Sequence, residues 1–138
     1  MLANKKAIAV IDGMGGKIGH QIVSQLRREF SESVEILAFG TNSAATANMI
    51  KARANRGATG ENAIRVSIGQ ADIIVAPVAS VIPNSNMGEL TTGMAEAIAS
   101  SDAIKIHLPL GQFQVSFVGG DRQRIPHRRG RGRAQGKR

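Results

Sequence analysis

Short, uninterrupted apolar runs recur along the chain and predict the strands of a buried sheet. The first run, residues 6–11, is rich in Ile, Val and Ala and stops at Asp12 and Gly13. Such runs are typical of parallel strands covered on both faces, because neither face then needs polar residues. Similar runs follow at residues 34–39, 71–78 and 103–108, and residues 114–118 are expected to form a hairpin strand at the sheet edge.

Between these runs, apolar residues recur at helical spacing. The first predicted helix has one apolar side, formed by Ile18, Ile22, Val23, Leu26 and Phe30. Residues 43–54 predict a second helix that Gly57 terminates, and residues 91–100 predict another. Residues 57–60 are expected to form a loop. Residues 62–70 suit either a helix or a strand, and we favour a short helix because a crossover must precede the next parallel strand.

This alternation of strands and helices predicts an α/β protein. The expected architecture is a Rossmann-like three-layer sandwich, in which a mostly parallel sheet with an antiparallel C-terminal edge strand is covered by helices on both faces. The four residues we expect to be buried on the first strands are Ile8, Val10, Ile36 and Ile74, and Ile106 is expected to be buried on the last. A chain of 138 residues fits one such domain.

Composition excludes several kinds of chemistry. The chain has no cysteine, which rules out disulfides, thiolate catalysis and cysteine-ligated metals. Aromatic residues make up 3% of the chain, with no Trp or Tyr, so stacking platforms for nucleic-acid bases are not expected. The first apolar run is too short for an export signal or a membrane span, and the protein is expected to be cytoplasmic and not to bind a membrane.

Positive charge is concentrated at the C-terminus. Residues 1–120, the predicted domain, contain ten Lys and Arg residues against nine Asp and Glu, whereas residues 121–138 contain eight against Asp121 alone. This Arg/Gly-rich tail has almost no apolar residues and is predicted to be disordered. It is either a solvated basic extension or a segment that binds nucleic acid through phosphate neutralisation.

The candidate functional site is the glycine-rich turn between the first strand and the first helix. It consists of Asp12, Gly13, Met14, Gly15, Gly16, Lys17, Ile18 and Gly19. Glycines allow a sharp turn and a close approach of ligand to backbone, and the free N–H groups of a helix start attract anions. The pattern GxGGxxG is close to the dinucleotide-binding fingerprint GxGxxG, with the last glycine one residue late. The alternative is that the glycines serve only the turn and the packing of helix on sheet.

Three features depart from known phosphate-binding patterns. The carboxylate of Asp12 would repel a phosphate unless it binds a cation such as Mg²⁺ or orients the glycine turn. The second strand is followed by Thr41 and Asn42 and not by an acid for the ribose hydroxyls of NAD, which suits NADP better. Lys17 is followed by Ile18, so the Walker A pattern fails.

Loops at the same sheet edge supply further candidate residues. Thr59 could cap a helix, or it could face the glycine turn together with Glu61 and Asn62. Residues 77–89, with Pro77, Asn84 and Ser85, could line the site or pack on a second subunit of a homo-oligomer. No histidine pair has metal-ligand spacing, and no nucleophile motif is present, so no catalytic residue is assigned.

Several strings together resemble a known family. They are residues 9–13, 15–19, 40–42, 57–64 and 94–98. The chain resembles, over residues 6–119, a family of small bacterial proteins classed as a domain of unknown function. The resemblance implies a stand-alone small α/β domain, implies no activity, and leaves the basic tail outside. From the glycine turn we expect a domain that binds a nucleotide or another phosphate-bearing ligand there. The alternatives are a protein that binds nucleic acid through its Arg-rich tail and a non-catalytic structural or assembly protein.

Overall fold

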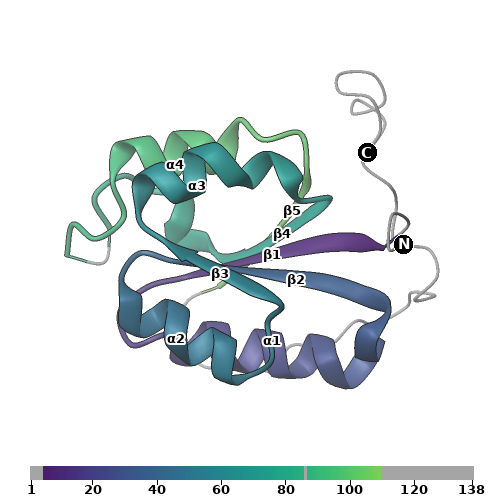
Figure 1. The fold of residues 1–138 in the computed structure, drawn as a ribbon. Helices are drawn as coiled ribbons and strands as arrows, with labels where there is room; N and C mark the ends of the chain where they lie inside the picture. The colour runs from purple at the N-terminus through teal and green to yellow at the C-terminus, as the bar shows by residue number, and fades with distance from the viewer. Residues whose placement is uncertain (1–4, 86, 110–138) are drawn as a thin grey trace.

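A computed structural model of the chain describes residues 5–85 and 87–109. In these residues one five-stranded sheet, with the order β3-β2-β1-β4-β5, is parallel throughout (Figure 1). The strands are β1 (Lys6–Asp12), β2 (Val34–Gly40), β3 (Arg56–Thr59), β4 (Ile73–Pro77) and β5 (Ile104–Leu108). The helices are α1 (Lys17–Phe30), α2 (Ser43–Lys51), α3 (Glu61–Ser67) and α4 (Thr92–Ala99). The Rossmann-like α/β prediction is confirmed.

Helices cover both faces of the sheet, as the apolar runs predict. Figure 1 shows α1 and α2 together on one side and α3 and α4 together on the other. This arrangement follows from right-handed crossovers: the chain moves from β1 outward through β2 to β3, then returns to β4 on the other side of β1. The helices of the two halves therefore lie on opposite faces.

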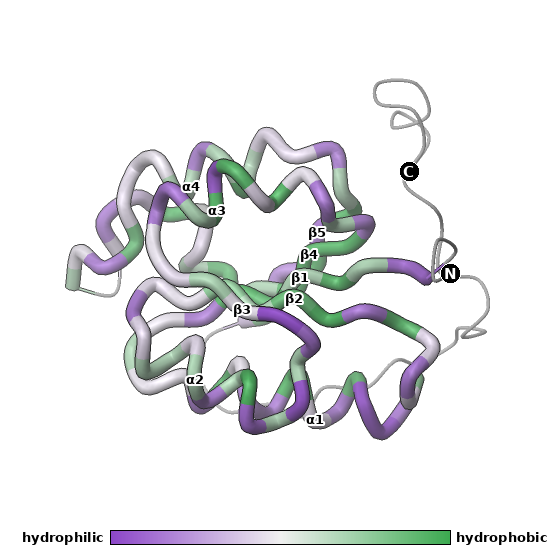
Figure 2. The backbone as a smooth tube through the Cα atoms, in the orientation of Figure 1, coloured by the Kyte–Doolittle hydropathy of each residue, from purple (hydrophilic) through white to green (hydrophobic). Residues whose placement is uncertain are grey.

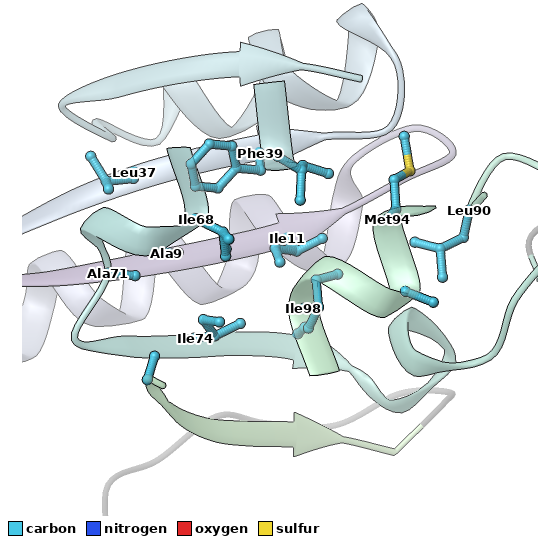
Figure 3. Packing of buried hydrophobic residues seen from close by; sticks show 14 of the residues in the cluster. Ala9, Ile11, Leu37, Phe39, Ile68, Ala71, Ile74, Leu90, Met94 and Ile98 are labelled. Carbon is cyan, nitrogen blue, oxygen red and sulfur yellow. The ribbon is translucent and has the colours of Figure 1, made fainter. Parts of the chain in front are cut away.

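Alternating residues of the central strands feed two separate cores. On the α1 and α2 face, Ile8 and Val10 pack with Leu26 of α1 and Met49 of α2. On the α3 and α4 face, the strands contribute Ala9, Ile11, Leu37, Phe39 and Ile74, which pack with Leu90, Met94 and Ile98 (Figure 3). In Figure 2 the strands are mainly hydrophobic where they cross the centre of the sheet, with polar positions near their ends, whereas many polar residues lie on the helices and loops.

The third strand corrects a sequence-based prediction. Residues 57–60 were expected to be a loop, but Arg56–Thr59 forms β3 beside β2. Its residues are exposed or half-buried and include one glycine, so they lack the apolar pattern of a strand. The preceding helix ends at Lys51 and not at 54, because Arg53 adopts a left-handed φ of 85° that breaks the helix.

Burial at the sheet edge also differs from expectation. Ile8, Val10, Ile36 and Ile74 are buried as predicted, but Ile106 is 37% exposed. It belongs to β5, which pairs only with β4 among the described strands. The predicted antiparallel strand 114–118 and the tail 121–138 lie outside the described residues and stay predictions. No helix in the described part of the chain is long and apolar enough to cross a membrane.

Candidate functional site

The glycine-rich turn lies at the carboxyl edge of the sheet, where the direction of the strand order changes. The chain leaves β1 toward β2 on one side, and β4 leads to β5 on the other. In open parallel sheets, loops diverge at this point and leave a crevice in which ligands bind. The segments that follow β2 and β4 both contact the turn, so the sheet brings together loops that are distant in sequence.

Two left-handed residues shape the turn itself. Met14 has a φ of 53° and Gly16 a φ of 77°, and the Gly16 N–H donates to the Gly13 carbonyl oxygen over 2.9 Å. Gly15, between them, is exposed and has a φ outside the left-handed region. The exposed Lys17 then begins α1.

Gly15, Gly16 and Gly19 differ in whether the surrounding structure leaves room for a side chain. A Cβ on Gly16 would lie 2.7 Å from Ala45 Cα, and one on Gly19 would lie 2.6 Å from Met49 Sδ and 2.9 Å from Asp12 Cβ. These two glycines allow α1 to pack closely on α2 and on β1. A Cβ on Gly15 would meet no atom within 4 Å. Packing within the fold therefore requires glycine at positions 16 and 19, but it does not require glycine at position 15.

The carboxylate of Asp12 is directed into the turn. It is 8% exposed, and its Oδ2 accepts a hydrogen bond from the Gly19 N–H over 2.6 Å. Burial raises the pKa of Asp12 above its ordinary value, against the opposing effect of backbone amides led by that of Gly19; the charge of Glu89 adds to the increase. This geometry is that of a group that orients the glycine turn.

A second carboxylate, that of Glu89, lies on the outer side of the turn. Its Oε1 is 2.8 Å from the Met14 backbone nitrogen and 2.6 Å from Thr41 Oγ1. Its Oε2 is 2.9 Å from Asn42 Nδ2. These donors, the Thr41 hydroxyl first, hold the pKa of Glu89 below its ordinary value.

Sequence reasoning did not single out Glu89, although it named the segment that carries it. The available signal was an acid in the loop after β4, the strand next to β1 at the carboxyl edge. Asn48 was also missed: its Nδ2 donates to the Gly15 carbonyl oxygen over 3.2 Å. This contact depends on the packing of α2 against the turn, for which the sequence carries no local signal.

Thr41 and Asn42, the two site residues predicted after β2, both lie at the glycine turn and make hydrogen bonds that hold the local structure. The Thr41 N–H donates to the Asp12 carbonyl oxygen over 3.0 Å. Asn42 is the N-cap of α2, because its Oδ1 accepts from the Ala45 N–H over 2.8 Å. Its Nδ2 also donates to the Met14 carbonyl oxygen over 2.8 Å. Asn42 thus joins the start of α2 to the glycine turn.

The residues predicted after β3 lie at the same sheet edge but make other contacts. Thr59 does not cap α3, whose N-cap is Gly60; its Oγ1 is 2.7 Å from Thr46 Oγ1. Glu61 accepts from the Thr91 hydroxyl over 2.7 Å, and Asn62 is exposed. Within the described residues, no hydrogen bond joins Glu61 or Asn62 to the glycine turn.

The residues predicted after β4 stabilise their own loop. Pro77 is the buried last residue of β4, the Asn84 N–H donates to the Leu90 carbonyl oxygen, and Ser85 Oγ donates to the Ala79 carbonyl oxygen. Ile82 and Met87 are exposed, so the loop presents apolar side chains to its surroundings. Packing of this loop on a second subunit stays a prediction.

Two further observations on the described residues concern sites away from the turn. They contain no group of three or more His, Asp or Glu side chains placed to hold a metal ion. A shallow hollow of about 150 Å³ lies between β2, β3 and the end of α3, lined by residues 37–39 and 56–58 with Ser67 and Gln70. It includes none of the predicted site residues.

The buried carboxylate gives a pH-dependent prediction. Because the pKa of Asp12 is raised in the folded state, the folded chain holds this proton to higher pH than the unfolded chain does. The free energy of unfolding should therefore fall as the pH rises from the ordinary Asp value through the raised one. Asp12→Asn removes this contribution while an amide oxygen still accepts from Gly19. Thermal unfolding between about pH 4 and pH 8, the range in which buried carboxyl groups with a raised pKa titrate, should show the variant gaining stability relative to the wild type as the pH increases.

The matched control for this experiment is Glu96→Gln, an exposed carboxylate on α4. It removes one carboxylate that is exposed to solvent, and it serves as the reference for the effect of removing the buried one. A constant difference between Asp12→Asn and the wild type would contradict the burial effect.

These features define a small Rossmann-like protein, with a parallel sheet and a glycine-rich turn at the switch point of its strand order. The chain belongs to the family described as domain of unknown function DUF3842, whose model matches residues 7–130. The match extends farther than the resemblance over residues 6–119 suggests, and it includes the beginning of the basic tail. No curated protein matches the chain.

Proposed function

We propose that this protein binds a nucleotide or another phosphate-bearing small molecule at the glycine-rich turn. One observation carries the proposal. Among the described residues, the backbone N–H groups of Gly15 and Lys17 donate to no protein acceptor, and both residues are exposed. They lie at the start of the 14-residue helix α1, where the helix dipole favours negative charge.

The different surroundings of Gly15 and Gly19 support the same proposal. In dinucleotide-binding turns, one glycine lets the backbone approach the pyrophosphate and another allows close packing of the helix. Gly19 has the packing role, as its contacts with Met49 and Asp12 indicate. Gly15 has the geometry of the approach role, because its surroundings are open and its conformation does not require glycine. A phosphate oxygen would occupy that space.

Asp12 does not oppose this proposal. Its carboxylate is buried and accepts from Gly19 on the inner side of the turn, whereas Gly15 and Lys17 are exposed. The proposal therefore assigns Asp12 to the conformation of the turn and needs no Mg²⁺ ion on it. Ile18, half-buried against the α1 and α2 core, anchors the first turn of the helix.

A panel of phosphate compounds tests the proposal. We expect the melting temperature to rise with at least one of NAD, NADP, ADP, GDP or pyrophosphate, each tested with and without Mg²⁺. A ligand that binds only the folded state stabilises it by about 2.7 kcal/mol at about 100 times its Kd. If none raises the melting temperature at millimolar concentration, the turn has a purely structural role and the proposal fails.

A further inference from the structure

We propose that Glu89 accepts hydrogen bonds from ribose hydroxyls of the ligand, so that the site takes a ribonucleotide with free 2′- and 3′-hydroxyls. This inference rests on the proposed function and specifies its ligand. It reverses the preference for a 2′-phosphate that the sequence around Thr41 and Asn42 suggests. Three features of Glu89 support the assignment: the position of its carboxylate, the free acceptor capacity of its oxygens, and the backbone amides that it leaves unoccupied.

The position of Glu89 matches that of an acid that holds a ribose. Dinucleotide-binding domains hold the ribose with an acid located at the end of the second strand, close to the glycine turn. Here β2 ends at Gly40 and is followed by Thr41 and Asn42. Glu89 comes from the loop after β4, and its hydrogen bonds with Met14, Thr41 and Asn42 place its carboxylate between the turn and the end of β2. The acid missing from the sequence of β2 is thus supplied in space by another loop.

The carboxylate of Glu89 can accept more hydrogen bonds than it receives from the described residues. An ionised carboxylate accepts about four hydrogen bonds, two on each oxygen. Oε1 already accepts from the Met14 N–H and the Thr41 hydroxyl, whereas Oε2 accepts from Asn42 alone among the described residues. Oε2 therefore retains capacity for a ligand hydroxyl. A 2′-phosphate at this position would instead meet a carboxylate of like charge, which is unfavourable.

Glu89 leaves the backbone amides of Gly15 and Lys17 available for a phosphate. Glu89 contacts the Met14 N–H, whereas the amides assigned to phosphate are those of Gly15 and Lys17. Carboxylate and phosphate would therefore occupy neighbouring positions on the turn and not the same one. The opposing view is that Glu89 is an internal anion that any phosphate ligand must displace, and the experiment separates the two.

The experiment compares four ligands on the full chain by isothermal titration: pyrophosphate, ADP, 2′-deoxy-ADP and 2′-phospho-ADP, with the guanine series in parallel. We expect the wild type to bind the ribonucleotide at least about tenfold more tightly than its 2′-deoxy and 2′-phospho forms, within the discrimination known for sites that hydrogen-bond a hydroxyl. Glu89→Gln should lose most of this discrimination, measured within the variant as the ratio of its affinity for ADP to its affinities for the 2′-deoxy and 2′-phospho forms, so that a change common to all the nucleotides cancels. Glu96→Gln, an exposed acid on α4, is the control and should behave as the wild type.

Three results would overturn the inference, and they differ from one another. Equal affinity for the three sugar forms would exclude recognition of the hydroxyls by Glu89, with the proposed function intact if pyrophosphate or ADP binds. Tighter binding of every ligand, pyrophosphate included, to Glu89→Gln would show that the carboxylate competes with phosphate. Binding of none of the ligands to a folded wild type would remove the proposed function, and this inference with it. Thermal unfolding of each variant verifies that it is folded.

Discussion

Replacing Gly15 with valine is expected to abolish nucleotide binding and to leave the stability of the fold nearly unchanged. Gly15 has a φ that other residues adopt, and a Cβ there would meet no protein atom within 4 Å. The new side chain would occupy the space in which a phosphate approaches the Gly15 amide, so affinity should fall about 100-fold or more, a loss of about 2.7 kcal/mol. Titration with the compound that stabilises the wild type measures the first effect, and thermal unfolding measures the second.

Gly16→Val is the matched control and should give the opposite result. Gly16 has a φ of 77°, and its Cβ would lie 2.7 Å from Ala45 Cα and 2.9 Å from the Ala45 carbonyl oxygen. Left-handed strain and overpacking together should cost about 3 kcal/mol of folding free energy. If Gly15→Val binds the ligand as the wild type does, phosphate does not approach this amide. If Gly15→Val destabilises the protein as much as Gly16→Val, Gly15 serves the fold.

Arg27→Met is expected to cost about 3 kcal/mol of folding free energy, the typical scale for removing a buried, hydrogen-bonded charged group. Arg27 is 4% exposed near the C-terminus of α1. Its Nη1 donates to the carbonyl oxygens of Ser31 over 2.8 Å and Val34 over 3.1 Å. Its Nε donates to the Arg53 carbonyl oxygen over 2.9 Å, and its Nη2 donates to Asn55 Oδ1. Methionine would fill the space but leave these acceptors without a donor.

Chemical and thermal denaturation of Arg27→Met should show this loss as a lower midpoint in both. The neighbouring Arg28→Met provides the control: Arg28 makes an exposed hydrogen bond to Gln25, so its loss should cost less than about 0.5 kcal/mol. A stability of Arg27→Met close to that of Arg28→Met would mean that the guanidinium contacts contribute little beyond packing.

The elements that were predicted correctly carry their signal locally. In β1, consecutive apolar residues stop at the glycine turn, and in α1 the apolar residues repeat at helical spacing, so both could be read from a short window. β3 has four residues and no such pattern. It becomes a strand because it lies beside β2, where the backbone of Ala38 and Phe39 offers a ladder of hydrogen bonds. Its existence therefore depends on tertiary context.

In the candidate site too, the part with a local sequence signal was predicted and the part that depends on distant contacts was not. The glycine turn was identified from spacing alone, because the transition from strand to helix restricts which residues fit there. The importance of Glu89 was not identified, because it is 75 positions from Met14 and meets it only through the pairing of β4 with β1. The proposed preference for a ribonucleotide over its 2′-phosphate form rests on that contact.

The sequence by itself determined the class of fold, the central strands, the amphipathic α1 and the position of the glycine-rich turn. These follow from hydrophobic periodicity and from backbone freedom, which act between residues close in the chain. Only the tertiary structure decided the strand order, the burial of Arg27, the inward direction of Asp12 and the approach of Glu89 to the turn. The approach of Glu89 depends on β4 lying beside β1, and the burial of Arg27 depends on the packing of the segment before β3 against α1. The direction of Asp12 depends on the close packing of α1 on β1 at Gly19. These arrangements follow from the packing of whole elements and not from any local pattern of residues.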